Sequence, residues 1–206
     1  MKKYILFILI IPTFALAQFE NYIVDEYNPT HKTLAGGMFG MIEQGAGIGA
    51  FYELPYSNFW HLGGRIDGFM LRDSKQIEYY DYYGYPQIMN KRNNAFLIDL
   101  IVTAKKRILA NELDDSIRPF VNFGAGLVYG MNFPEYDLDP IEGTPTGNQF
   151  GLTYTVLGSI GVDATINPGS YFGLSLEYRL MKFNKNIGET NNYSTIGIRL
   201  EIGKRF

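Results

Sequence analysis

The last fifteen residues, 192–206, alternate between apolar and polar side chains. One face carries Ile196, Ile198, Leu200, Ile202 and Phe206, interrupted only by Lys204, and the other carries Thr195, Gly197, Arg199, Glu201, Gly203 and Arg205. A period of two residues is that of a β-strand. One apolar face opposite one charged face is typical of a membrane β-barrel, in which lipid lies outside and a polar lumen inside.

The N-terminus has the three parts of a secretory signal peptide. Lys2 and Lys3 form a basic region, residues 4–14 are mostly apolar, and Ala15-Leu16-Ala17 is a small-x-small cleavage site before Gln18. An N-terminal membrane anchor is the alternative, but this apolar run is too short to cross about 30 Å of hydrocarbon. The sequence therefore predicts three parts: a signal peptide at 1–17, a periplasmic lead-in at 18–32 and a barrel at 33–206.

Charge and composition narrow the class further. Without Lys2 and Lys3, 16 basic side chains face 21 acidic ones, a net charge of −5, which gives no reason to expect nucleic-acid binding. The chain has no cysteine, so an exported form has no disulfides to stabilise it. After the signal, no apolar run approaches the 18 residues of a membrane helix.

Seven earlier segments resemble the last one in their alternation. They are roughly 33–42, 46–54, 59–72, 94–107, 118–131, 150–166 and 171–183. In the first we expect Leu34, Met38 and Ile42 to face lipid. The fourth is apolar on both faces around Asp99, so a core helix is an alternative there. The predicted fold is all-β, an eight-stranded antiparallel transmembrane β-barrel with a filled polar interior.

The lengths of the connections support this count. The turns after the second, fourth and sixth strands are short, whereas two of those on the other side, 73–93 and 132–149, are the longest in the chain. Short periplasmic turns and longer extracellular loops are a feature of outer-membrane barrels.

These features together resemble the small outer-membrane barrels of Gram-negative bacteria, the class of outer-membrane proteins A, X and W. The phrases VNFGAGLVYG at 121–130 and LEYRL at 176–180 are similar to phrases common in that class. The resemblance implies outer-membrane lipid and the assembly machinery as partners, with Leu200, Ile202 and Phe206 as the assembly signal. The aromatic-rich composition and Gln18 after the cleavage site suggest a source among the Bacteroidota.

The inward face is predicted to hold many charges of both signs. The expected interior network comprises Arg65, Asp67, Asp99, Lys105, Arg107, Asp163, Glu177, Arg179, Arg199 and Glu201. Eight strands leave a lumen just wide enough for side chains, and an unpaired buried charge is costly, so we expect a satisfied polar plug. A gated channel, a ligand pocket and a carboxylate pair for acid–base catalysis would present the same pattern.

Catalysis and metal binding have weak support. The only histidines are His31, in the lead-in, and His61, expected inside near the periplasmic end of its strand, away from outer-leaflet lipid. The acidic loop 135–142 could bind Ca²⁺ through alternating carboxylates, but it lacks EF-hand spacing. We therefore predict no enzyme activity, no cofactor and no dedicated metal site.

The loop 73–93 gives the better indication of function. It holds five tyrosines, side chains that combine large contact area with a polar tip: Tyr79, Tyr80, Tyr82, Tyr83 and Tyr85. They could equally belong to an aromatic girdle. The favoured hypothesis is a structural or surface-interaction protein that meets an extracellular protein or glycan through its loops. The alternatives are a narrow pore for small or apolar solutes and a secreted soluble carrier resembling a lipocalin.

Overall fold

The structure is a computed structural model that describes residues 32–57, 59–73, 77–89, 93–109, 117–134, 147–164 and 169–205. The predicted signal peptide, His31, the acidic loop 135–142 and Phe206 lie outside the described residues. Among the residues that are described, no helix is long and apolar enough to cross a membrane.

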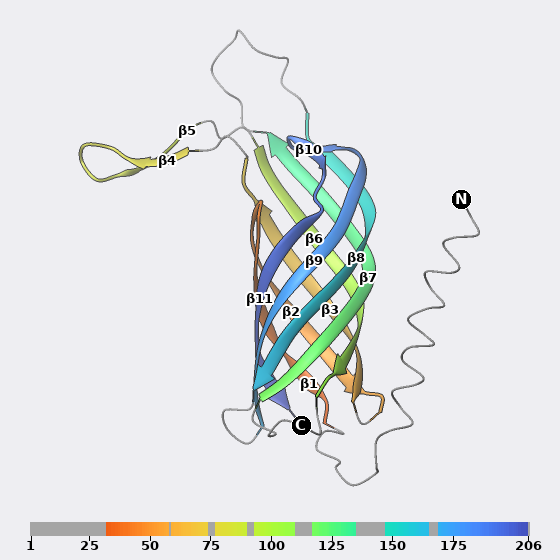
Figure 1. Cartoon of the computed structure of the whole chain (residues 1–206). Coiled ribbons are helices and arrows are strands. Elements are labelled where there is room, and N and C mark those ends of the chain that lie inside the picture. Colours follow the sequence, from red (N-terminus) through yellow and green to blue (C-terminus); the bar gives the residue numbers. More distant parts are fainter. Residues whose placement is uncertain are drawn as a thin grey trace.

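Eight long antiparallel strands of the described chain close into a barrel (Figure 1). These strands are β1 (Leu34–Ile42), β2 (Gly45–Pro55), β3 (Trp60–Leu71), β6 (Asn93–Arg107), β7 (Ile117–Pro134), β8 (Gln149–Ala164), β9 (Ser170–Ile187) and β11 (Thr195–Arg205). Each pairs with the next along the chain, and β1 pairs with β11 to complete the ring. The predicted fold class and strand count are confirmed.

The remaining strands lie at one end of the barrel. β4 (Ile77–Tyr80) and β5 (Pro86–Met89) form a separate two-stranded hairpin, which projects to the side in Figure 1. β10 (Thr190–Asn192) pairs with the end of β9. The segment 73–93, interpreted as a loop from sequence, therefore contains two strands.

The two ends of the barrel differ in their connections. At one end the strands are joined through 56–59, 108–116 and 165–169, and at the other through 43–44, 72–92, 135–148 and 188–194. The end with short turns is the periplasmic end of an outer-membrane barrel, and the end with the hairpin is the extracellular end.

The alternation in sequence becomes an inside and an outside. Ile66 and Met70 on β3 and Leu176 on β9 are exposed on the outer surface, whereas Asp67, Phe69 and Leu71, which alternate with the outward positions of β3, are buried inside. The segment considered for a core helix is β6, with Asp99 inside and Leu100 outside.

The first strand is the exception, since its predicted faces are reversed. Leu34 is 0% and Met38 7% exposed, while Phe39 and Met41 face outward. The register explains this, because β1 pairs Leu34 with Arg205 and Met38 with Glu201, two inward residues of β11. Paired residues point to the same side of a sheet. The prediction that Leu34, Met38 and Ile42 face lipid is therefore wrong.

The exterior is that of a membrane-spanning barrel. Exposed apolar side chains cover the outer wall, and Tyr52 and Trp60 lie near the periplasmic end, with Tyr129 and Tyr154 toward the other end. The outward Tyr178 lies midway along β9 instead. A soluble carrier would need the reverse arrangement, with charges outside and apolar side chains lining a cavity. That alternative is wrong.

Candidate functional site

The lumen is filled in three layers. At mid-height lies the central cluster, six charged side chains contributed by four strands: Arg65 and Asp67 from β3, Asp99 from β6, Glu177 and Arg179 from β9, and Arg199 from β11. All six are at most 5% exposed. Three positive and three negative charges balance within this layer.

The geometry of the central cluster is densely cross-linked. Arg65 makes a bidentate pair with Glu177, with Nη1 to Oε2 at 2.9 Å and Nη2 to Oε1 at 3.1 Å. Arg199 approaches the same carboxylate at 2.9 Å and Asp67 at 3.2 Å. Arg179 donates to Asp67 at 2.6 Å and also to Asp99 and Glu177. Bidentate charge-assisted contacts fix geometry as well as adding energy.

A second layer, the lower cluster, lies nearer the periplasmic end. The ammonium group of Lys105 is 3.8 Å from Glu53, 3.7 Å from Asp163 and 3.7 Å from Glu201. Lys105 also donates to the Tyr171 hydroxyl, which in turn donates to Glu201 at 2.7 Å. One ammonium group thus links three strands, β2, β8 and β11, through their carboxylates.

Further residues complete this lower cluster. Arg107 and Arg205 lie 3.9 Å and 3.7 Å from the Asp163 carboxylate. The Lys105 ammonium lies 4.0 Å from the centre of the Phe120 ring, a cation–π geometry. The predicted network residues are therefore all inside, but in two separate clusters rather than one.

Three polar members of the lower cluster are absent from the predicted network: Glu53, Tyr171 and Arg205. Glu53 alternates with the outward Tyr52 and Leu54, so the period of two already placed it inside. Tyr171 opens its strand, where a tyrosine is more readily interpreted as part of a girdle.

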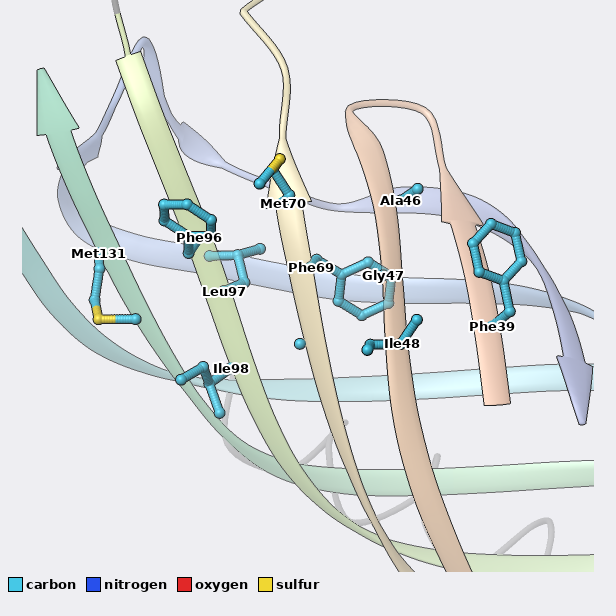
Figure 2. A pocket seen from close by; sticks show the side chains of 11 residues that line it. Phe39, Ala46, Gly47, Ile48, Phe69, Met70, Phe96, Leu97, Ile98 and Met131 are labelled. Atoms are coloured by element: carbon cyan, nitrogen blue, oxygen red, sulfur yellow. The ribbon is translucent and has the colours of Figure 1, made fainter. Parts of the chain in front are cut away.

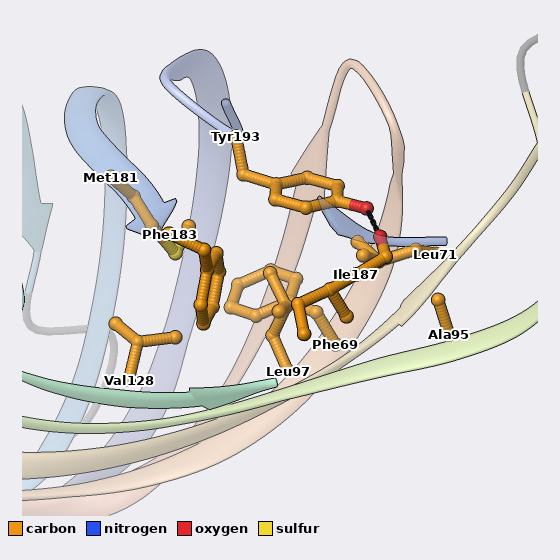
Figure 3. Close-up of a cluster of buried hydrophobic side chains, with 9 residues drawn as sticks. All are labelled: Phe69, Leu71, Ala95, Leu97, Val128, Met181, Phe183, Ile187 and Tyr193. Carbon is orange, nitrogen blue, oxygen red and sulfur yellow. Dashed lines mark hydrogen bonds between the residues drawn. The ribbon is translucent and has the colours of Figure 1, made fainter. Parts of the chain in front are cut away.

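The third layer, the apolar cap, fills the extracellular end of the lumen (Figure 3). It consists of Phe69, Leu71, Ala95, Leu97, Val128, Met181, Phe183, Ile187 and Tyr193. The Tyr193 hydroxyl donates to the carbonyl of Ile187, and its ring meets Phe183 edge-on at 6.0 Å. The Arg179 guanidinium lies 4.6 Å from the Phe69 ring centre, so the cap rests directly on the central cluster.

Glycine makes room for one ring of the cap. A Cβ atom added to Gly47 on β2 would lie 2.6 Å from Cδ1 of Phe69. Across the β1–β2 pair, Gly40 faces Gly47 and lies under the same ring, with an added Cβ 3.2 Å from Cε1. The absence of side chains at both positions therefore seats Phe69 against the wall.

A chain of amide and carboxylate contacts ties the extracellular ends of neighbouring strands together. Asp73 accepts two hydrogen bonds from Asn93, both at 2.8 Å, and Asn132 donates to Asn93 at 2.8 Å and to Gln149 at 3.2 Å. Gln149 also accepts from the backbone N–H of Gly188 at 2.6 Å. Just inside this rim, burial raises the pKa of Tyr193 to about 12, assisted by the charges of Asp73 and Glu189.

The β4–β5 hairpin carries the predicted contact tyrosines outside the barrel. Tyr80, Tyr82, Tyr83 and Tyr85 are 76%, 97%, 80% and 64% exposed, and Tyr79 is 44% exposed. Because this hairpin is a separate sheet that projects from the barrel in Figure 1, they pack neither in a girdle nor over the lumen.

Asp81 organises the tip of that hairpin. Its Oδ1 accepts from the backbone N–H groups of Tyr83 and Tyr85, both at 2.9 Å, and its own N–H donates to the Tyr85 carbonyl at 2.9 Å. Gly84 has a φ of 82°, the left-handed conformation that glycine adopts without strain. The tyrosines are thus displayed on an ordered turn.

The remaining sequence predictions concern His61, a metal site and the assembly signal. His61 is 1% exposed inside β3 near the periplasmic end, as expected. In the described ranges no group of three or more His, Asp or Glu side chains could hold a metal ion. Leu200 and Ile202 face outward on β11, as an assembly signal would require, and that role stays a prediction.

Comparison with known proteins identifies the fold. No protein-family model matches this chain, and no curated protein sequence is similar to it. Among solved structures, Neisserial surface protein A is similar with a TM-score of 0.51 and 10% identity, over 84% of this chain and 94% of that one. The N-terminal β-barrel domain of Pseudomonas aeruginosa OprF has a TM-score of 0.49 and 10% identity, over 86% and 98%. Ail of Yersinia pestis has a TM-score of 0.46 and 11% identity, over 85% and 97%.

At these identities the likeness is one of fold. The apolar outer wall and the polar lumen of this chain show that the barrel suits a membrane. A closed antiparallel barrel with an apolar exterior and a polar core satisfies every backbone group internally, as a bilayer requires. The chain is an eight-stranded β-barrel of the outer-membrane type.

Proposed function

We propose that this protein is a non-conducting barrel of the outer membrane that acts as a structural or surface-interaction protein through its extracellular hairpin. The observation that carries the proposal is the hairpin itself, with Tyr80, Tyr82, Tyr83 and Tyr85 exposed on a turn ordered by Asp81. Tyrosine supplies rigid, amphipathic contact area at low entropic cost, which is why binding loops use it.

The filled lumen supports the same proposal. The central cluster, the lower cluster and the apolar cap occupy successive levels, which favours a plugged barrel over the narrow pore considered from sequence. With the interior occupied, contact with other molecules falls to the outer surface and the loops. The chemistry of the hairpin suits an extracellular protein or glycan.

A direct test is binding by proteoliposomes that carry the folded protein, presented to arrays of glycans and of immobilised extracellular matrix proteins. We expect retention on at least one member of the arrays. Replacing Tyr80, Tyr82, Tyr83 and Tyr85 by serine should reduce it about tenfold or more, because clustered aromatic residues carry most of the energy of such interfaces.

Two further variants make the test specific. Tyr56→Ser removes a tyrosine that is 75% exposed in the turn after β2, at the opposite end of the barrel, and should bind like the parent. Asp81→Ala keeps every tyrosine but loses the ordered turn, and should weaken binding partially. Undiminished retention of the serine variant, or no retention of the parent, would contradict the proposed role.

A further inference from the structure

A groove of about 450 Å³ lies on the outer wall of the barrel (Figure 2). It crosses β1, β2, β3, β6 and β7, and its lining includes Phe39, Ala46, Ile48, Gly68, Met70 and Phe96. Each of these positions lies toward the extracellular end of its strand. The groove therefore faces the outer leaflet of the bilayer.

The register of the strands shows how the groove arises. One cross-strand row on the outer face runs from Phe39 through Ile48 and Gly68 to Ile98. Gly68 stands between two isoleucines that are 72% and 41% exposed, so a side chain is missing from the middle of an otherwise bulky row.

The gap at Gly68 is open rather than filled by a neighbour. An added Cβ atom would meet only the carbonyl oxygen of Ile48, at 3.9 Å. In the adjacent row Ala46, Met70, Phe96 and Met131 follow one another, with the small Ala46 at one side. Unbranched Met70 and Met131 side chains adapt to an irregular occupant.

We propose that this groove binds one acyl chain of an outer-leaflet lipid. The outward side chains around it are apolar and lie in the wall that contacts hydrocarbon, and an unfilled hollow there would forfeit dispersion contacts on its whole lining. A stable interface between two proteins buries about 800 Å² on each partner. The groove exposes far less surface than that, so it suits a single chain rather than the face of a second barrel.

The experiment is native mass spectrometry of the refolded protein, incubated with dipalmitoyl phosphatidylethanolamine and then stripped of detergent in the gas phase. The parent should retain one lipid per barrel. Gly68→Leu fills the gap, its Cβ coming no closer than 3.9 Å to the backbone, and should lower the retained fraction about fivefold or more.

The chain offers a matched control on the same strand. Gly64 also faces outward on β3, and its added Cβ would meet only the carbonyl oxygen of Ile101, at 3.9 Å. Gly64→Leu adds the same bulk to the lipid-facing wall outside the groove and should retain lipid like the parent. Ala46→Leu narrows the groove from β2 and replaces Gly68→Leu if the latter does not fold.

Three results would overturn the proposal. The first is a parent that retains no more lipid than Gly68→Leu. The second is a Gly64→Leu variant that loses lipid equally, which would mean that any added bulk on the wall has this effect. The third is a protein dimer that disappears in Gly68→Leu, which would assign the groove to a second copy of the chain.

Discussion

Asp67 on β3 and Asp99 on β6 lie directly opposite each other in the antiparallel register, both buried in the lumen. Like charges in this position repel each other and destabilise the strand pair. Arg179 resolves the conflict from β9, because it donates to both carboxylates and also to Glu177. Arg179 thus compensates Asp99, whereas Asp67 also lies 3.2 Å from Arg199.

Arg179→Leu is the first prediction that follows. It should lower the free energy of unfolding by about 3–5 kcal/mol, because buried carboxylates would lose their counter-charge. Urea titration of the refolded protein in lipid vesicles measures the change. Adding Asp99→Asn to Arg179→Leu should restore part of the loss, and a single variant as stable as the parent would refute the plugged interior.

Lys105→Met tests the lower cluster in the same way. It leaves Glu53, Asp163 and Glu201 facing one another without their shared ammonium, and we expect a loss of about 3–5 kcal/mol. Lys106→Met is the control, since this neighbouring lysine lies over the Trp60 ring at 5.0 Å outside the network and should matter by less than about 1 kcal/mol. Equal losses of stability for the two variants would show that the buried network does not contribute more to folding than a lysine outside it does.

Gly47→Ala probes the seat of the apolar cap. The added methyl would meet the Phe69 ring at 2.6 Å and the Gly68 carbonyl oxygen at 2.4 Å, so the wall or the ring must shift. Overpacking of this kind costs about 1–3 kcal/mol. Gly37→Ala on β1, whose methyl meets only the Gly49 carbonyl oxygen at 3.8 Å, should leave thermal stability unchanged. The melting temperatures of both variants, measured by heat-dependent gel mobility, test this difference. Equal melting temperatures would contradict the proposed seat of Phe69.

Stability at alkaline pH should depend on Tyr193. Its pKa is raised from 10 in the unfolded chain to about 12 by burial, so the folded state favours the neutral phenol. The resulting stabilisation is complete below pH 10 and is lost as the pH rises toward 12. Tyr193→Phe should lack this part of the decline in unfolding titrations between pH 9 and 12. Parallel declines for variant and parent would exclude Tyr193 as the source.

Single-channel recording of the refolded protein in a planar bilayer tests the filled lumen as a whole. We expect an inserted barrel that produces no steady conductance, because two ion-paired layers and an apolar cap lie across the path. Heat-sensitive gel mobility of the same sample confirms that the barrel is folded. Discrete, reproducible steps would establish a pore and remove the basis for a silent barrel.

The alternation of side chains correctly predicts which residues face inward and outward when the two faces of a strand differ strongly in polarity. On β9 and β11 leucine and isoleucine alternate with arginine and glutamate, so the inside and the outside follow at once. On β1 no charged side chain marks the lumen, and glycine and methionine occur on both faces. There the orientation is set by pairing with β11, which a pattern within one strand does not contain.

The layers of the lumen could not be predicted for a related reason. Which charges meet depends on the stagger between distant strands, so Lys105 and Arg179 look equivalent in sequence yet lie in different clusters. The apolar cap departs from the rule of a polar lumen. The apolar inward residues Ala95 and Leu97, in the segment where a helix was the alternative, were the visible sign of it.

The position of Arg179 has a consequence for how the barrel is made. Asp67 and Asp99 enter the wall long before β9 in chain order, and they stand 112 and 80 residues from the guanidinium that neutralises them. Until β9 arrives, Asp99 would lack its counter-charge, and Asp67 would keep only Arg65, 3.4 Å away on its own strand. An uncompensated charge in a low-dielectric environment costs several kcal/mol. Insertion strand by strand is therefore uphill in its middle stages. The barrel should enter the membrane only once its last third can close around the lumen, in a single cooperative step.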